Sequence, residues 1–165
     1  MSIFIAFIML FWVGTSWGST SGMKVTASGY EKGNKPDNAI DQDYSTHWTC
    51  RGERWLQLDA GSMIKDNDIF LLWKDSAKPR EAFFDVALSI DGKKWKTVFS
   101  GSESDNGWYA IIDFEEQRFR YVRVIGHGNS ISNHNSIVEI SGFEPDAAAD
   151  YDERIVAGVT ASSPG

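Results

Sequence analysis

The sequence predicts an all-β domain folded as an antiparallel sandwich, and three observations lead to this prediction. Between residues 23 and 143, the apolar residues form short continuous or alternating runs that are typical of strands. Turn-forming residues separate these runs, and no stretch keeps a sustained helical period. Strands at regular spacing, without crossover helices or a fixed repeat, favour a sandwich of antiparallel strands.

The predicted strands follow one another at short intervals along the chain. In order, they cover residues 55–58, 69–73, 84–90, 95–99, 109–114, 121–125 and 136–141. Asp91 and Gly92 lie between the third and fourth runs and are a typical hairpin signal. Other turns or loops are predicted where small and turn-forming residues gather, at residues 60–62, 100–102 and 126–130.

Length and composition fit one folded domain with a short segment at each end. The 165 residues are 42 % hydrophobic and 24 % charged, which excludes disorder over the whole length. The net charge of -7 argues against a general nucleic-acid binder, because such proteins carry a basic patch or stripe. Residues 144–165 hold five acids and one base, and we predict this acidic segment to be a flexible tail or linker.

Residues 1–18 read as a secretory signal peptide. Residues 2–13 are almost all apolar, and the small residues Ser16 and Gly18 follow where a signal peptidase would cut. The run is short for a bilayer span and no second apolar segment exists, so we predict a secreted protein without a membrane span. The domain then covers residues 19–143. The single cysteine, Cys50, cannot form an intrachain disulfide and is predicted to be a small buried residue.

Four segments resemble, in order and spacing, the landmarks of the discoidin or coagulation factor V/VIII type C domain. They are PDNAIDQDYSTHW at 36–48, WLQLDAG at 55–61, FDVALSIDGKKW at 84–95 and RYVRV at 120–124. The resemblance covers about residues 25–143 and implies a discoidin-like jelly roll. Within that superfamily the chain resembles the family 32 carbohydrate-binding modules. IGHGNS at 125–130, followed by NSI at 135–137, is most similar to modules attached to alginate lyases.

A loop rich in oxygen ligands is a candidate calcium site. Asp41, Asp43 and Thr46 place two carboxylates and a hydroxyl within six residues, which suits a hard cation, although both acids could simply form turns. Glu139 lies on an inward-facing strand pattern, where an unpaired carboxylate would be costly. The resemblance implies a structural calcium held by the carbonyls of Asn38 and Val138 and by the side chains of Asp41, Asp43, Thr46 and Glu139.

The resemblance also implies a glycan site on loops at one end of the sandwich. Such sites use a flat aromatic ring and fixed polar groups, and an acidic polysaccharide would add a need for arginine or lysine. The polar candidates are Arg51, Lys74, Lys78, Arg80, His127, Asn129, Asn133, His134 and Asn135. The exposed aromatic candidates are Trp108 and Tyr109. The expected ligand is a polysaccharide such as alginate, or another uronate- or galactose-containing glycan.

Simpler interpretations of these residues remain open. The asparagines could satisfy their own loop backbones, and Lys78 and Arg80 could be solvated charges beside Pro79. His127 and His134 lie seven apart with no cysteine nearby, so no zinc site is predicted. The strand patterns place four tryptophans in the predicted core, namely Trp48, Trp55, Trp73 and Trp95.

No catalytic motif is present in the sequence, so we predict a binding module rather than an enzyme. The chain lacks a Gly-x-Ser-x-Gly elbow, a His-Glu-x-x-His pair and a catalytic cysteine context, although a glycosidase with two unrecognised carboxylates remains a rival. A protein- or phospholipid-binding discoidin domain is the second rival. DERIVAG at 152–158 resembles the activation junction of a trypsin-like zymogen, so a catalytic domain could follow in a longer precursor; a plain linker is the alternative.

Overall fold

Seven strands and one short 3-10 turn make up the described part of the chain. The computed structural model describes residues 22–74, 80–105 and 109–143. The elements are β1 (Lys24–Ala27), η1 (Pro36–Ala39), β2 (Trp48–Arg51), β3 (Arg54–Trp73), β4 (Arg80–Ser89), β5 (Lys96–Asp105), β6 (Tyr109–Asn129) and β7 (His134–Ser141). All strand pairings are antiparallel, and no α-helix occurs among the described residues, which confirms the predicted all-β class.

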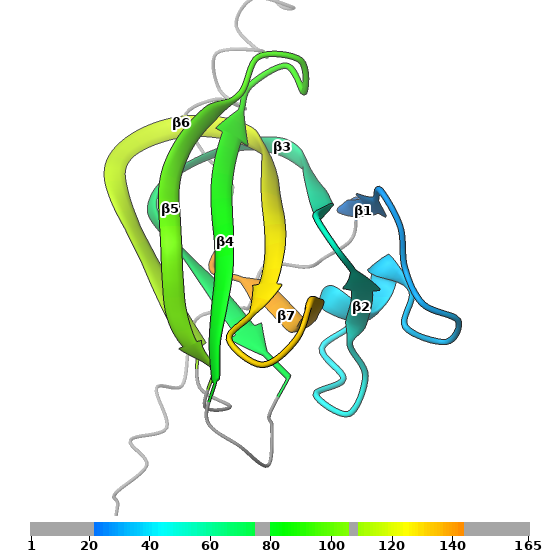
Figure 1. The fold of residues 1–165 in the computed structure, drawn as a ribbon. Helices are drawn as coiled ribbons and strands as arrows, with labels where there is room; N and C mark the ends of the chain where they lie inside the picture. The colour runs from blue at the N-terminus through cyan, green and yellow to red at the C-terminus, as the bar shows by residue number, and fades with distance from the viewer. Residues whose placement is uncertain (1–21, 75–79, 106–108, 144–165) are drawn as a thin grey trace, which may run out of the picture.

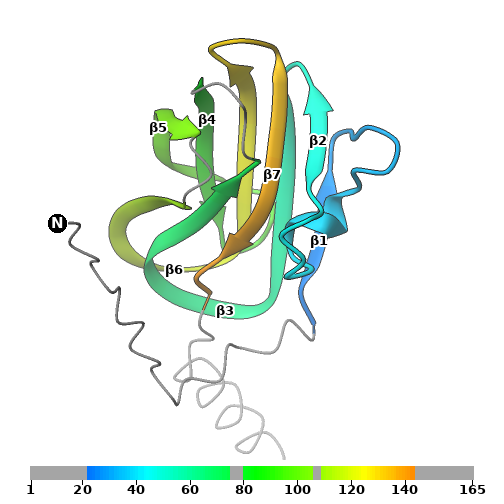
Figure 2. The same ribbon diagram turned by 90° about the horizontal axis from the view of Figure 1, so that it is seen from below.

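The long strands β3 and β6 bend and take part in both layers of the sandwich (Figures 1 and 2). Residues 54–59 of β3 pair with β1 and with residues 121–126 of β6, and β4 and then β5 continue this layer. Residues 64–72 of β3 pair with residues 109–119 of β6. The same half of β3 pairs along its other edge with β7, next to which β2 lies. The two bends therefore close the jelly roll.

The bends correct several boundaries predicted from the sequence. Runs 55–58 and 69–73 are two halves of β3, and runs 109–114 and 121–125 are two halves of β6. At residues 60–62 the strand continues through a register shift, where Gly61 adopts a φ of 80°. Such irregularities bend a strand without ending it, which is why a glycine there resembles a turn.

Two further turn predictions have different outcomes. The Asp91–Gly92 hairpin is confirmed, because β4 and β5 pair on either side of it and Leu88 lies opposite Lys96. The turn predicted at 100–102 is wrong, because these residues lie inside β5 and Gly101 pairs with Phe84. The strand β6 also extends to Asn129, into the loop predicted at 126–130.

The core lies between the two layers and confirms part of the predicted burial. Trp48 is 0 % exposed, Trp73 and Cys50 are each 3 % exposed, and all three belong to one apolar cluster. The prediction that Trp55 and Trp95 are core residues is wrong, since both are only half-buried and pack against a guanidinium. Strand periodicity places a side chain on one face of the sheet but does not reveal whether a second layer covers that face.

None of the helical structure in the described ranges is long and apolar enough to cross a membrane.

Candidate functional site

The oxygen-rich loop between η1 and β2 folds around the hydroxyl of Thr46. This hydroxyl donates to Asp41 Oδ2 at 2.8 Å and lies 3.1 Å from the carbonyl oxygen of Asp43 and 3.5 Å from that of Asn38. Glu139 Oε2, from β7, accepts the backbone N–H of Gln42 at 3.2 Å. The fold therefore brings the sequence-predicted residues of this loop next to Glu139, which lies 97 positions away from Gln42 in the chain.

Glu139 is the most unusual titratable group of this loop region. It is 4 % exposed, and burial raises its pKa to about 7, although the N–H of Gln42 opposes the shift; the charge of Asp41 raises the pKa further. A buried carboxylate facing a second carboxylate is unfavourable unless a cation or proton neutralises it. This placement fits a divalent cation between β7 and the loop.

Val138 and Asp43, two further predicted calcium ligands, lie in the same region. Val138 is the bulged residue of β7, because Leu72 lies opposite Glu139 while Trp73 lies opposite Ile137. The carboxylate of Asp43 accepts the N–H and hydroxyl of Ser45 at 2.9 and 2.6 Å. Its carbonyl oxygen is therefore the atom that lies near Thr46.

No group of three or more His, Cys, Asp or Glu side chains in the described segments is arranged to hold a metal. A cation at Glu139 would therefore depend on carbonyl and hydroxyl oxygens as well as on carboxylates. Calcium accepts such mixed oxygen ligands in flexible numbers, whereas structural zinc sites are built mainly from cysteine sulfur and histidine nitrogen.

A second region gathers the basic candidates where β3 ends and β4 begins. Lys74 Nζ lies 3.1 Å from His47 Nε2, and Arg80 Nη2 donates to the carbonyl oxygen of Lys74 at 2.8 Å. We call these three residues the Lys74 cluster. Burial, and then the charge of Lys74, lower the pKa of His47, which favours the neutral ring. Since an ammonium can only donate, Nε2 is the acceptor of this contact. Because a neutral ring leaves the ammonium charge uncompensated, Lys74 can attract an anion.

Arg51 and His134 lie beside each other on the paired strands β2 and β7. They are direct register partners, and both contact Glu31: Arg51 Nε lies 3.0 Å and His134 Nε2 lies 3.4 Å from Glu31 Oε1. Both side chains are therefore directed toward a carboxylate of the protein itself. The exposed Arg51 pair is weak by itself and could exchange Glu31 for a ligand carboxylate.

His127 occupies a separate position on the outer face of the β4 layer. Its Nε2 lies 3.0 Å from Asp85 Oδ2 and its Nδ1 lies 3.5 Å from Glu53 Oε2. Asp85 also accepts the hydroxyl of Ser100 at 2.5 Å. The bonds from Ser100 and His127 outweigh the effect of burial, which acts in the opposite sense, and keep the pKa of Asp85 low. His127 and His134 thus contact different carboxylates.

The asparagines at the ends of β6 and β7, on either side of the loop that joins them, bond to the protein backbone. Asn129 accepts the N–H groups of Ile131 and Ser132 and donates to the carbonyl of His134 at 2.8 Å. Asn135 is 2 % exposed and accepts the N–H of Gly128 at 2.7 Å. Its amide also donates to the carbonyl of Gly52. These contacts support the simpler interpretation that the asparagines shape the loop.

Asn133 also takes part through its backbone, since its carbonyl accepts the N–H of Gly52 at 2.9 Å. The remaining predicted residues are Lys78, Trp108 and Tyr109. Lys78 and Trp108 lie outside the described residues, and Tyr109 begins β6 opposite Leu72 without a described side chain. Two residues of the region escaped the sequence analysis, namely His47 and Glu31. His47 precedes the buried Trp48 in the 36–48 motif, but its contact with Lys74 depends on strand register.

The chain matches a known protein family over most of its length. Residues 24–140 match the F5/8 type C domain model, so the chain belongs to the F5/8 type C domain family. This confirms the resemblance predicted from the four sequence segments.

Among solved structures, the fold is similar to family 32 carbohydrate-binding modules. The CBM32 of AlyQ, solved in complex with 4,5-unsaturated mannuronic acid, is 33% identical, with a TM-score of 0.67 over 73% of this chain and 93% of that one. A pectin-binding module is 29% identical, with a TM-score of 0.68 over 76% and 91% of the two chains. A truncated AlyQ with CBM32 and alginate lyase domains is 34% identical, and the match covers 31% of that chain.

Proposed function

We propose that this protein is a secreted, non-catalytic carbohydrate-binding module for an acidic polysaccharide, with alginate as the first candidate. The observation that carries the proposal is the Lys74 cluster, in which the Lys74 ammonium faces the His47 imidazole and the Arg80 guanidinium bonds to the Lys74 backbone. Both AlyQ's module and the pectin-binding module take uronate-type ligands, and they are among the similar structures of higher identity. The chemistry of the cluster and that of these ligands agree.

Each member of the Lys74 cluster would have a distinct role toward a uronate. Lys74 would supply a point charge for the carboxylate, and Arg80 would offer a planar pair of donors. The bond from Arg80 to the Lys74 carbonyl fixes the guanidinium beside the Lys74 backbone, which reduces the freedom lost on binding. His47 keeps the ammonium oriented without neutralising it. The sugar hydroxyls would bond to the polar groups around Arg51 and His134.

A calcium ion is the second part of the proposal. Asp41, Thr46 and Glu139 would hold it through their side chains, and Asn38 and Val138 through their carbonyls. Asp43, predicted to bind through its side chain, would bind through its carbonyl, because its carboxylate bonds to Ser45. Such an ion would neutralise the facing carboxylates and tie the loop to β7. Extracellular proteins use calcium sites of modest affinity in this way, which agrees with the signal peptide predicted at residues 1–18.

Catalysis is not part of the proposed function. In AlyQ the CBM32 and the alginate lyase are separate domains, and this chain matches the module. We propose that this chain likewise binds polymer without cleaving it, with or without a catalytic domain in a longer precursor. Incubation of the purified protein with alginate and pectin should release no oligosaccharides; measurable turnover would overturn this part.

Affinity electrophoresis tests the binding directly. The purified protein is run through gels containing alginate, pectin, galactan or cellulose, with calcium or with a chelator. We expect alginate to retard it, and Lys74→Ser or Arg80→Ser to weaken the retardation roughly tenfold, since a charged hydrogen bond is lost. Lys35→Ser removes an exposed cation that is paired with Asp37 and should change nothing. Retardation by no polysaccharide, with the fold intact by circular dichroism, would refute the proposal.

A further inference from the structure

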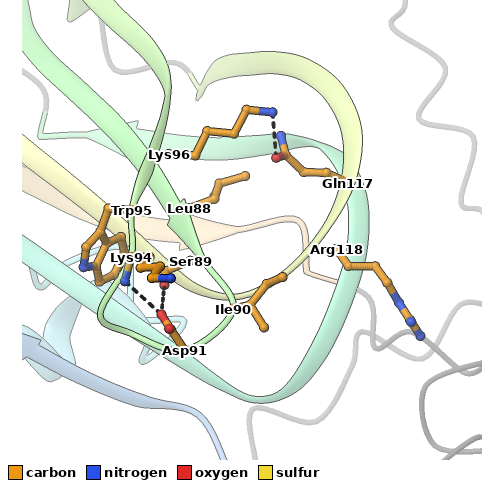
Figure 3. A pocket seen from close by; sticks show the side chains of 9 residues that line it. All are labelled: Leu88, Ser89, Ile90, Asp91, Lys94, Trp95, Lys96, Gln117 and Arg118. Carbon is orange, nitrogen blue, oxygen red and sulfur yellow. Dashed lines mark hydrogen bonds between the residues drawn. The ribbon is translucent and has the colours of Figure 1, made fainter.

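A groove (Figure 3) lies at the C-terminal end of β4, whereas Arg80 of the Lys74 cluster begins this strand. It has a volume of about 440 Å³ and lies between the β4–β5 hairpin and the bend of β6. This volume falls within the range of roughly 300–1,000 Å³ usual for ligand sites. The residues that give it its character are Leu88, Ile90, Lys94, Lys96, Gln117 and Arg118. We call it the hairpin groove.

The charge around the hairpin groove is basic, although the chain as a whole is acidic. Lys94 and Lys96 line it, Arg118 lies at its edge with the side chain pointing away from the lysines (Figure 3), and Asp91 is the acid among its lining residues. The carboxylate of Asp91 is occupied by its own turn, because it accepts the N–H groups of Lys93 and Lys94 at 2.9 and 2.8 Å. The groove therefore favours an anion.

The neighbouring polar groups leave this basic character in place. Lys96 Nζ donates to the neutral amide oxygen of Gln117 at 3.1 Å, so this bond does not cancel its charge. Glu116, which precedes Gln117 in β6, is paired with Lys65 at 2.9 Å. A ligand carboxylate could therefore bond to Lys96 without displacing a carboxylate of the protein from it.

The groove also offers apolar surface of a kind that a sugar ring can cover. Leu88 is 3 % exposed and forms the floor, while Ile90 is 62 % exposed and projects from the turn (Figure 3). The ring of Trp95 packs on Arg123, with the guanidinium carbon 4.0 Å from the ring centroid, and this supports the β5 side. A uronate ring presents CH groups on one face and a carboxylate at its edge, which matches an apolar floor with a basic rim.

Two anion-attracting regions thus lie at opposite ends of one strand (Figure 1). Arg80 begins β4 and Ser89 ends it, and nine steps along a strand span about 30 Å. A short oligosaccharide cannot reach both regions at once. A long polymer can bind both through separate segments, and two polymer chains can bind to one protein molecule.

We propose that the hairpin groove is a second binding site for the uronate units of an acidic polysaccharide, and that the protein is bivalent. The identity of the polymer rests on the proposed function, but the groove itself rests on its own residues. Two linked sites make retention on polymer stronger than either site alone and allow the protein to cross-link chains.

The test maps both sites on the full-length protein by NMR titration with an alginate tetrasaccharide. We expect amide shifts at Lys74 and also at Leu88 and Ile90. Lys94→Ser combined with Lys96→Gln should weaken the response at Leu88 and Ile90 roughly tenfold and leave that at Lys74 unchanged. Lys93→Ser is the matched control, because this neighbouring lysine does not line the groove. A neutral cellotetraose should leave the groove unshifted.

The outcomes separate this inference from the proposed function. Shifts confined to the region of Lys74 would refute the second site and leave the function standing. Shifts confined to the hairpin groove would support the inference and refute the Lys74 cluster as the binding site, and shifts at neither would refute both. Phosphatidylserine vesicles, added in a parallel titration, should leave the amide shifts of the groove residues unchanged. If they alone perturb Ile90, the groove is a lipid site and the inference is wrong.

Discussion

The guanidinium of Arg123 lies between two tryptophan rings, and removing it should destabilise the protein. Its Cζ is 4.8 Å from the ring centroid of Trp55 and 4.0 Å from that of Trp95. Both Nε and Nη2 donate to Gln57 Oε1, at 3.2 and 2.6 Å. Burial lowers the pKa of Arg123, but a guanidinium stays charged in proteins. Arg123→Met keeps much of the apolar stem and removes every one of these contacts.

The expected loss in free energy of unfolding is about 3 kcal/mol. Each cation–π contact at a half-buried site contributes about 1 kcal/mol, and the fork of charged hydrogen bonds to Gln57 contributes about as much. For a domain of this size such a loss lowers the melting temperature by roughly 10 °C. The β4–β5 hairpin should loosen first, because Trp95 connects it to β6 through Arg123.

Urea unfolding followed by tryptophan fluorescence measures this loss. The midpoint should fall in Arg123→Met with an unchanged slope, while Arg118→Met, an exposed arginine on the same strand, should stay within about 0.5 kcal/mol of the parent. A double-mutant cycle of Arg123→Met with Trp95→Leu isolates one stacking contact. A coupling energy below about 0.3 kcal/mol, the limit expected for independent sites, would refute the stacking explanation.

Two further predictions concern the calcium site and acid stability. A chelator should lower the melting temperature of the parent but leave that of Glu139→Gln unchanged. Calcium at a hundredfold excess over its Kd would contribute about 2.7 kcal/mol to the stability of the parent. Identical melting of the parent with and without chelator would contradict the site. The bidentate bond from Arg120 lowers the pKa of Asp59. Its stabilisation is therefore present above about pH 4 and lost as the pH falls through the lowered pKa. Asp59→Asn should flatten this acid limb of a urea-midpoint profile, and an unchanged limb would exclude the pair as its cause.

The local pattern of the sequence was enough to predict the strand class, the 91–92 hairpin and the burial of Cys50 and Glu139. Each of these follows from short-range chemistry. Alternating apolar residues form strands, an Asp-Gly pair favours a tight turn, and an acid within an apolar run lies in the core. The grouping of Asp41 and Thr46 was visible for the same reason, because their spacing is local.

Predictions from the sequence are wrong where a local signal has two structural meanings. The glycine at 61 resembles a turn but lies in the bend of β3, and the one at 101 lies within β5 opposite Phe84. Whether a glycine ends a strand or bends it depends on whether a neighbouring strand continues the ladder across it. That neighbour comes from a distant part of the chain.

The amino-acid sequence by itself determined that this chain forms an antiparallel β-sandwich of a recognisable family, because strand period, turn chemistry and motif spacing are properties of neighbouring residues. Only the tertiary structure decided that Lys74 meets His47, that Arg51 and His134 share Glu31, and that Arg123 separates two tryptophans expected in the core. Each contact joins strands whose register is set by the packing of the whole sandwich, and a shift of one residue would turn every side chain to the opposite face.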